Sequence, residues 1–513
     1  IEALRHASDY SIQMLQSAVK VTVQNATEFQ ELPDPQEPTM AAFNFLLSMW
    51  VSVIMDSQAW DTITNTFPDG ARMLQAIKQF TFPLFQAALC GRMEIAKCLV
   101  SVGLDDDDEF EDVSALNAQM QDLGILARTN VDAALSTMRH AMVDTASRLR
   151  TTASGGRTDM SCVLEEMWWV CHFLGHILTD DDEMEGSNVP LIPRAVLDAA
   201  FAGFVGTANG GGTFELMGLT EDMFAIVEFE CTRIMNALGA AGSGGGGVAA
   251  ASSLSPLLAE KLLWLTRRWA RSYLMPDASM YDVNHGVSPN LLAAYGAESS
   301  TAHSLVNFLV SKACMFLAFW GYEEGVCREA CQLLKNLAFR HTTRKSLLQQ
   351  DAFLVLVRSF STAVAEGRRS KTANVSEGGD VAIFSQGLKN LPDQYAEELV
   401  FLICRACDGF DDASAQLANF SQAVNPILTR FQYLVGPQDF VAISSQRPAV
   451  SLEILRLLGM FCGIAKSTTT QNHNTVFSCL STLLPSIVQL IHVYRTHDLI
   501  LKNILRFFAL LAE

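Results

Sequence analysis

Apolar residues recur at the spacing of an α-helix from one end of the chain to the other, and turn signals interrupt them about every 15 to 25 residues. Residues 258–269 show the pattern well. Leu258, Leu262, Leu265 and Trp269 are four, three and four positions apart and so lie on one helix face. The alternation that marks a half-buried strand is rare. The pattern therefore predicts a chain built almost wholly from helices.

Helices of this kind are predicted throughout both halves of the sequence. In the N-terminal half they cover residues 9–24, 39–54, 71–101, 110–128, 130–150, 158–179, 190–205 and 219–240. In the C-terminal half they cover residues 253–274, 296–320, 322–338, 345–363, 381–390, 393–409, 411–434, 446–467, 471–495 and 496–511. Taken in pairs they form units of roughly 40 to 50 residues, the length of HEAT or armadillo repeats. We therefore predict an all-α, HEAT/armadillo-like α-solenoid, a superhelix of antiparallel helix pairs. This prediction is based on the length of the units, because the sequence does not repeat from one unit to the next.

Segments rich in proline, glycine or charge separate the predicted helices. They are residues 31–38, 105–112, 180–186, 206–213, 242–247 and 365–380. No Gly-Lys-Ser/Thr follows the glycine runs and no predicted strand precedes them, so they are predicted to be linkers and not phosphate-binding loops. Residues 242–252 are predicted to be a Gly/Ala-rich linker loop between an N-terminal part of the solenoid, 1–241, with acidic and Gly-rich insert loops, and a C-terminal part, 253–513.

The charge of the chain limits the partners that it can bind. With 55 acidic and 36 basic residues among 513, the formal net charge is −19, so the surface repels nucleic acid and anionic membranes and attracts basic proteins. The longest nearly apolar run, residues 41–55, is shorter than the ~20 residues that cross a bilayer and contains Asn44. We therefore predict neither nucleic-acid binding nor membrane insertion. Because the first residue is not methionine, we also expect a piece of a longer protein.

Twelve cysteines in a chain of this length do not form a disulfide framework, and they indicate a reducing compartment such as the cytosol or the nucleus. Two clusters have spacings that suit a metal: Cys404 with Cys407, and Cys171 with His172 and His176. A structural zinc site needs four ligands, usually as two close pairs, and neither cluster has an evident second pair. We predict buried core packing for both clusters, and no metal or cofactor.

The sequence shows no arrangement typical of catalysis. There is no Ser/His/Asp order with a nucleophile elbow, and no pair of carboxylates stands out from ordinary solvated helix faces. We therefore predict that the chain is not an enzyme. A hydrolase that uses an unrecognised site is kept as a rival hypothesis.

Three ordered stretches are similar to one family. Residues 164–200 contain a tryptophan-bearing helix that ends in GHIL, then an acidic turn and the tetrapeptide PLIP. Residues 264–312 begin with WLTRRWARSYL and continue through AAYGAE into another helix. Residues 452–468 form a leucine-rich helix that contains CGIA. Together these stretches resemble the exportin branch of the importin-β superfamily of nuclear transport receptors, and within it the exportin-4 family.

This resemblance implies a nuclear export receptor that wraps a protein cargo, is regulated by the small GTPase Ran in its GTP form, contacts nucleoporins and shuttles between nucleus and cytoplasm through the nuclear pore. The cargo that it implies is a basic protein such as hypusinated translation factor 5A. The most N-terminal repeats, which usually bind Ran in this superfamily, are then absent from the sequence. The alternative is a cytosolic HEAT-repeat scaffold or adaptor unrelated to transport.

Glu165, Glu166, Trp168 and Trp169 are the candidates for cargo binding. A carboxylate beside an indole face is suited to an extended ammonium side chain. The alternative is that both glutamates begin a helix, favour its N-terminus and remain in water. The acidic run 105–108 and the acidic run 180–183 are expected to be solvated loop charge that steers a basic partner.

Arg267, Arg268 and Arg271 lie with Trp264 on one side of the helix at residues 260–276. In a solenoid, these arginines either pair with acidic residues of the adjoining repeat or meet an acidic patch on a partner. Because the chain is acidic, we favour contacts with the adjoining repeat.

Overall fold

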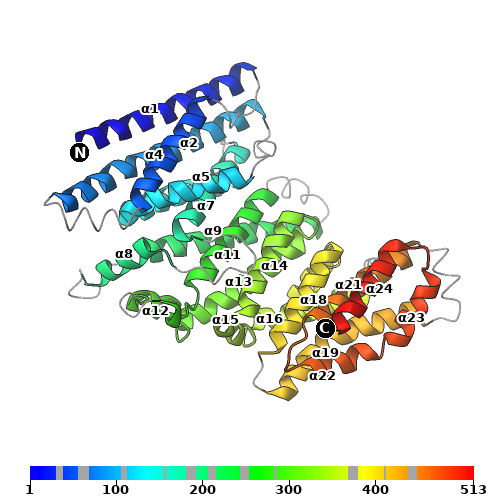
Figure 1. Cartoon of the computed structure of the whole chain (residues 1–513). Helices are drawn as coiled ribbons and strands as arrows, with labels where there is room; N and C mark the ends of the chain where they lie inside the picture. Colours follow the sequence, from blue (N-terminus) through cyan, green and yellow to red (C-terminus); the bar gives the residue numbers. More distant parts are fainter. Residues whose placement is uncertain are drawn as a thin grey trace. The chain divides into compact units, whose positions relative to one another are not determined.

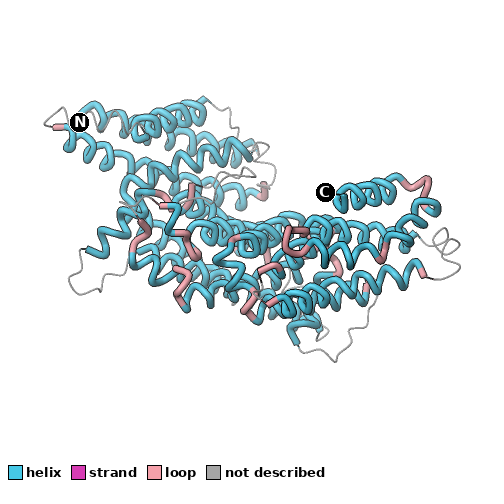
Figure 2. Tube along the Cα trace, turned by 60° about the horizontal axis from the view of Figure 1, so that its bottom comes forward, coloured by secondary structure: helices cyan, strands magenta, loops and turns pink. Residues whose placement is uncertain are grey.

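The computed structural model describes most of the chain. The described residues are 1–29, 38–55, 69–104, 113–153, 155, 159–180, 192–205, 215–242, 254–281, 286–367, 379–409, 412–436 and 448–512. Of these residues 87% are helical and none lies in a strand, as Figure 2 shows. The prediction of an all-α, HEAT-like solenoid from helical spacing is therefore confirmed.

The chain divides into two compact units, Ile1–Ala293 (unit 1) and Ala294–Glu513 (unit 2). The helices of unit 1 are α1 (Glu2–Gln24), α2 (Pro38–Met55), α4 (Gly70–Val102), α5 (Val113–Ala127), α6 (Val131–Ala153), α7 (Met160–Leu178), α8 (Arg194–Val205), α9 (Glu215–Gly242) and α11 (Pro256–Tyr273). α12 (Pro289–Tyr295) contains the boundary. Helices close in sequence pack on each other: α1 on α4, α2 on α5, and both α4 and α5 on α7 (Figure 1).

Unit 2 repeats this kind of packing. Its helices are α13 (Ser300–Phe319), α14 (Glu324–Phe339), α15 (His341–Leu347), α16 (Asp351–Glu366), α17 (Gly379–Leu388), α18 (Asp393–Cys407), α19 (Ala413–Val435), α21 (Pro448–Lys466), α22 (His473–Ser481), α23 (Leu484–Val493) and α24 (Asp498–Ala512). α13 packs on α14, α14 on α18, α18 on α21 and α21 on α24, while α16 contacts α17 and α19. These helices therefore pack mainly on near neighbours in the chain, as in a solenoid.

A few helix boundaries differ from those predicted. The single helix predicted at 471–495 is divided into α22 and α23, which are bent by 49°. Pro485 lies in the first turn of α23, where a backbone N–H has no partner within the helix and proline is tolerated. In the middle of one continuous helix, the same proline would remove a backbone hydrogen bond and break the helix. The helix predicted at 345–363 is shared between α15 and α16, and α1 begins at Glu2 instead of residue 9.

The predicted insert segments lie largely outside the described residues. This is true of 31–38, 105–112 and 206–213, and of most of 180–186 and 365–380. The linker expected at 242–252 also lies outside them, apart from Gly242, and the division of the chain at that linker stays a prediction. α11 packs on α7 and belongs to unit 1.

By length and composition alone, three described helices could cross a membrane: α2, α13 and α21. In the most apolar 18-residue stretch of each helix, 50% is buried within the protein in α13 and 61% in α21, as in core helices, but only 17% in α2. Composition therefore does not separate these helices from membrane spans, and the expectation that the chain does not insert into a membrane stays a prediction.

Glycines let neighbouring helices approach closely. A Cβ atom on Gly463 of α21 would meet the carbonyl oxygen of Glu397, and would lie 2.7 Å from Cγ1 of Val400, both on α18. A Cβ atom on Gly387 of α17 would likewise meet the backbone of Ala318 on α13. Backbone atoms cannot move aside as the end of a flexible side chain can. Only glycine fits at these two positions without a shift of one helix.

Gly463→Ala is expected to lower the free energy of unfolding by about 1–3 kcal/mol, the usual cost of forcing extra volume into a packed interface. Alanine is the better helix former by roughly 0.5–1 kcal/mol, so without the close contact the substitution would stabilise the protein. Urea unfolding of the wild-type and Gly463→Ala proteins measures this change in the free energy of unfolding. Gly286→Ala is the control, because no described atom outside its two chain neighbours lies within 4 Å of its Cβ position. A Gly463→Ala protein as stable as the wild type would contradict the close approach of α18 and α21.

Candidate functional site

α7 contains the four residues considered for cargo binding, and it is enclosed by other helices of unit 1. It begins at Met160 after Asp159, whose carboxylate accepts a hydrogen bond from the amide of Ser161 at 3.0 Å. α4, α5, α6 and α11 all pack on it. Every residue from Trp169 to Leu178 is buried. Most side chains on this helix therefore face protein and not solvent.

Glu166 is one of the buried residues, with 3% of its side chain exposed. Both terminal nitrogens of Arg148 on α6 donate to its carboxylate, Nη1 to Oε1 at 3.1 Å, and Nζ of Lys97 on α4 lies 3.5 Å from Oε1. A carboxylate removed from water must be paired in this way. The structure thus corrects the view of Glu166 as an open cargo contact: the residue joins α4, α6 and α7.

The helix-terminus alternative for the two glutamates is also wrong. Because α7 begins at Met160, Glu165 and Glu166 lie in its second turn, beyond the first turn in which a carboxylate interacts with the helix dipole. The helix predicted at 158–179 already places both glutamates beyond its first turn. The first turn instead contains Cys162, whose thiol contacts Glu166 at 3.6 Å.

Trp169 is a core residue, 1% exposed, and a cargo cannot reach it in this conformation. Its ring meets that of Trp168 edge to face, with centroids 4.9 Å apart, and the guanidinium carbon of Arg92 lies 4.7 Å from its centroid. Glu165 and Trp168 are half-buried. Of the four candidates, these two remain near the surface.

One face of Trp168 is already occupied by a cation of the chain itself. Nζ of Lys261 on α11 lies 4.1 Å from the ring centroid of Trp168 and 4.4 Å from that of Trp264, and 3.1 Å from Nδ1 of His172. The indole therefore does attract an ammonium group, as its chemistry predicts. Lys261 was not among the predicted site residues, although its position three residues before Trp264 places both on one face of the helix.

The arginine cluster of α11 is directed at α7. Arg268 is 1% exposed; its Nε donates to the hydroxyl of Thr179 at 2.9 Å, and its Nη2 to the carbonyl oxygen of Thr179 at 3.3 Å. The hydroxyl of Tyr273 donates to the carbonyl oxygen of Leu178 at 2.7 Å. These donors satisfy carbonyls at the end of α7. Arg268 thus contacts the end of a neighbouring helix through a hydroxyl and a carbonyl oxygen. Arg267 is buried and Arg271 half-buried, and the expected pairing of this cluster with acidic residues of the adjoining repeat stays a prediction.

His172 and His176 lie between these cations, with ring centroids 5.0 Å apart. Burial lowers the pKa of both imidazoles well below the usual 6.5, and the nearby charges of Lys261 and Arg268 lower it further. Nε2 of His172 and both ring nitrogens of His176 make no hydrogen bond within the described residues. Both rings are therefore neutral near pH 7 and pack as aromatic core groups.

The cysteines considered as metal ligands are buried, as predicted. Cys171, Cys404 and Cys407 are each 0% exposed, and burial raises the pKa of Cys171 and of Cys407 to about 12. Among the residues that the structure describes, no three His, Cys, Asp or Glu side chains are grouped so as to hold a metal ion. These thiols are core groups.

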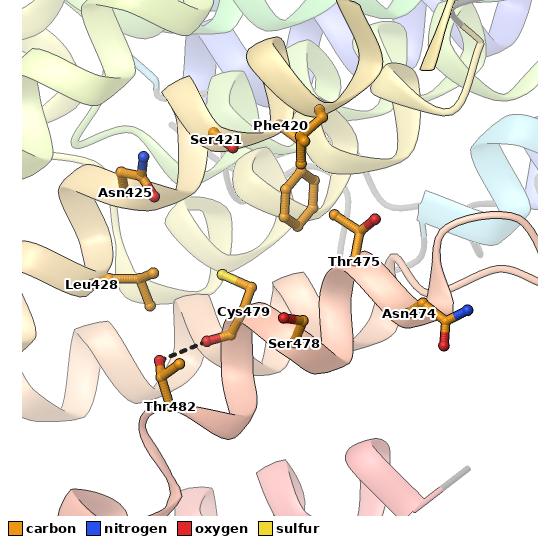
Figure 3. A pocket seen from close by; sticks show the side chains of 10 residues that line it. Phe420, Ser421, Asn425, Leu428, Asn474, Thr475, Ser478, Cys479 and Thr482 are labelled. Atoms are coloured by element: carbon orange, nitrogen blue, oxygen red, sulfur yellow. Dashed lines mark hydrogen bonds between the residues drawn. The ribbon is translucent and has the colours of Figure 1, made fainter. Parts of the chain in front are cut away.

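Unit 2 contains a surface groove that the sequence analysis did not identify. Figure 3 shows it between α19 and α22, where Phe420, Asn425 and Leu428 lie across from Thr475 and Cys479. The groove has a volume of about 460 Å³, and its lining residues carry no formal charge. Ordinary uncharged residues from two separate helices give no sequence motif, so nothing in the sequence could have identified it.

Comparison with known proteins gives two matches. A family model described as Exportin-4 matches residues 17–513. The Exportin-4 of Dictyostelium discoideum is 21% identical over 493 residues, which are 91% of this chain and 39% of that protein. The chain thus spans about two fifths of the length of this relative. The match extends on both sides of residues 164–468, the part in which the sequence motifs are found.

Acidification is expected to destabilise the protein through His172 and His176. Their folded-state pKa values are lowered, so below about pH 6.5 the unfolded chain binds protons that the folded chain does not, and stability is lost as the pH falls toward the folded pKa. Urea midpoints at about pH 7.5 and about pH 5.5 measure the loss. His176→Leu should reduce this pH dependence, and His140→Gln, at an exposed position of α6, should not. An unchanged pH dependence in His176→Leu would refute the assignment.

Proposed function

The chain belongs to the exportin-4 family, and from this premise we propose that it is a cargo-binding part of a nuclear export receptor. The match of the family model over residues 17–513 carries the proposal. The helical stack supports it, because stacked helix pairs offer long rows of side chains to a bound protein without forming a deep catalytic pocket. The runner-up is a HEAT-type scaffold unrelated to transport.

Regulation by Ran in its GTP form is part of this proposal, as is shuttling between nucleus and cytoplasm. A receptor of this kind must release cargo on one side of the nuclear envelope, and a ligand can drive release only if it binds the loaded and unloaded receptor differently. Because this chain covers 39% of its relative, we propose Ran regulation for the whole receptor and leave open which segment makes the contact.

Charge supports a basic cargo, for which hypusinated translation factor 5A is our leading proposal. A formal net charge of −19 attracts basic proteins and raises the rate of encounter. Glu165, whose side chain is half-buried, is the carboxylate candidate on α7 that lies nearer the surface than Glu166. Trp168 supplies an aromatic surface close to it along the helix, although Lys261 competes for that ring.

Passage through the pore requires contact with nucleoporins, and the groove between α19 and α22 is our candidate surface for them. Its lining mixes Phe420, Leu417 and Leu428 with hydroxyl and amide groups, and has no formal charge. A segment of low charge can enter such a groove without the cost of desolvating an ion. In so acidic a chain, this distinguishes the groove from surfaces suited to a basic cargo.

We expect the full-length receptor to bind Ran locked in the GTP state more tightly than Ran with GDP. We also expect its affinity for Ran-GTP to be higher when cargo is bound. Linkage requires that cargo then bind more tightly in the presence of Ran-GTP by the same factor. Titration calorimetry with each partner measures both affinities. If neither nucleotide form binds, with or without cargo, the receptor assignment is wrong and the scaffold is favoured.

Glu165→Gln is expected to weaken the binding of hypusinated translation factor 5A by about 1–3 kcal/mol, because it removes a carboxylate that would pair with the cation. Glu94→Gln is the matched control, since it removes the same charge from an exposed position of unit 1. Fluorescence anisotropy on labelled cargo gives both affinities. If the two substitutions weaken binding equally, Glu165 contributes only long-range electrostatic attraction and does not contact the cargo directly.

A further inference from the structure

A second cavity of unit 2 has the opposite character to the acidic surface. It has a volume of about 340 Å³ and lies where α14, α18, α21 and α24 meet. Its lining residues are Lys335, Gln394, Glu397, Glu398, Phe401, Lys466 and Arg506. Three of them are cations and two are carboxylates, so the cavity is locally positive in a chain whose formal net charge is −19.

Glu397 holds two of these cations side by side. Nζ of Lys466 donates to its Oε1 at 2.8 Å, and Nη1 of Arg506 donates to its Oε2 at 2.8 Å, while Nη2 of Arg506 also donates to Oε1. The Glu397 side chain is 11% exposed, and these hydrogen bonds raise the pKa of Arg506. Both oxygens of the carboxylate are therefore occupied, and the two cations are fixed at the cavity wall.

The cations retain donors that Glu397 does not use. A guanidinium has five N–H groups and an ammonium has three, whereas Arg506 and Lys466 direct only part of theirs at Glu397. Nζ of Lys335 lies 4.0 Å from Glu398, beyond hydrogen-bond range. The side chains of Lys335, Lys466 and Arg506 are 33%, 39% and 39% exposed. All three side chains are therefore partly open to solvent.

A purely structural role explains only part of this arrangement. A clamp between α18, α21 and α24 requires Glu397, Lys466 and Arg506. It does not require Lys335, which comes from α14 and does not bind Glu397, and it does not require an open cavity. Distant acidic residues do not cancel the local charge, because salt at physiological strength screens exposed charges beyond about 8 Å.

We propose that this cavity binds an acidic side chain of a partner protein, an aspartate or glutamate carboxylate. The carboxylate accepts hydrogen bonds from Arg506 and from the lysines, and the ring of Phe401 contacts the aliphatic part of the same side chain. Glu397, whose two oxygens already accept hydrogen bonds from Lys466 and Arg506, positions these donors. This inference does not depend on transport and concerns a different partner surface from the basic cargo.

The test uses the whole 513-residue chain and a fluorescein-labelled hexaglutamate peptide, with anisotropy as the readout at about 0.15 M salt, where distant acidic residues are screened. Lys335→Met should weaken binding about fivefold, since it removes one partly exposed cation and leaves the Glu397 clamp intact. Glu398→Gln should tighten binding by a similar factor, because it removes the competing carboxylate. A folding defect cannot produce that tightening. Lys502→Met removes a cation from the exposed side of α24 and should change little.

Three results would overturn the proposal: no binding by the wild-type chain, equal weakening by Lys335→Met and Lys502→Met, or no tightening by Glu398→Gln. Inorganic phosphate and free glutamate are then compared as competitors at equal concentration. Displacement by glutamate supports the carboxylate site. Displacement by phosphate alone would show a phosphate site and refute the assignment to an acidic protein side chain.

Discussion

The contact between Trp264 and Gly175 determines how α7 and α11 meet. A Cβ atom on Gly175 would lie 2.5 Å from Cη2 of the indole, so the ring rests on bare backbone. With the helices this close, Arg268 and Tyr273 reach the end of α7, and Lys261 lies over Trp168. His172 and His176 are buried in the same interface between α7 and α11, away from solvent. A larger residue at position 175 would separate all of these contacts together.

This geometry gives a physical meaning to two of the family motifs. GHIL contains Gly175, which contacts the indole of Trp264 on α11. CGIA contains Gly463, which lies against the backbone of α18. Both motifs are contacts between helices that are neighbours in the stack. At both places the close contact sets the distance between neighbouring helices of the stack.

Several basic residues of this acidic chain join its helices to one another. Arg148 pairs with Glu166, Arg506 and Lys466 pair with Glu397, and Arg268 satisfies backbone carbonyls. Internal use of cations leaves carboxylates in excess at the surface, which favours basic partners. The cavity beside Lys335 differs from this acidic surface, because its lining carries more cations than carboxylates. The groove between α19 and α22 is a third kind of surface, because its lining has no formal charge. Three chemically different surfaces suit a protein that binds several partners.

The sequence by itself determined the fold class, most helix positions and the burial of Cys404 and Cys407, because helical spacing and apolar surroundings act over a few neighbouring residues. It also contained the family motifs. Only the tertiary structure decided which charges are paired: Glu397 and Arg506 are 109 residues apart, and no local pattern joins them. For the same reason Glu165 and Glu166, adjacent in sequence, differ in burial, since each side chain's surroundings depend on which helices pack against its face.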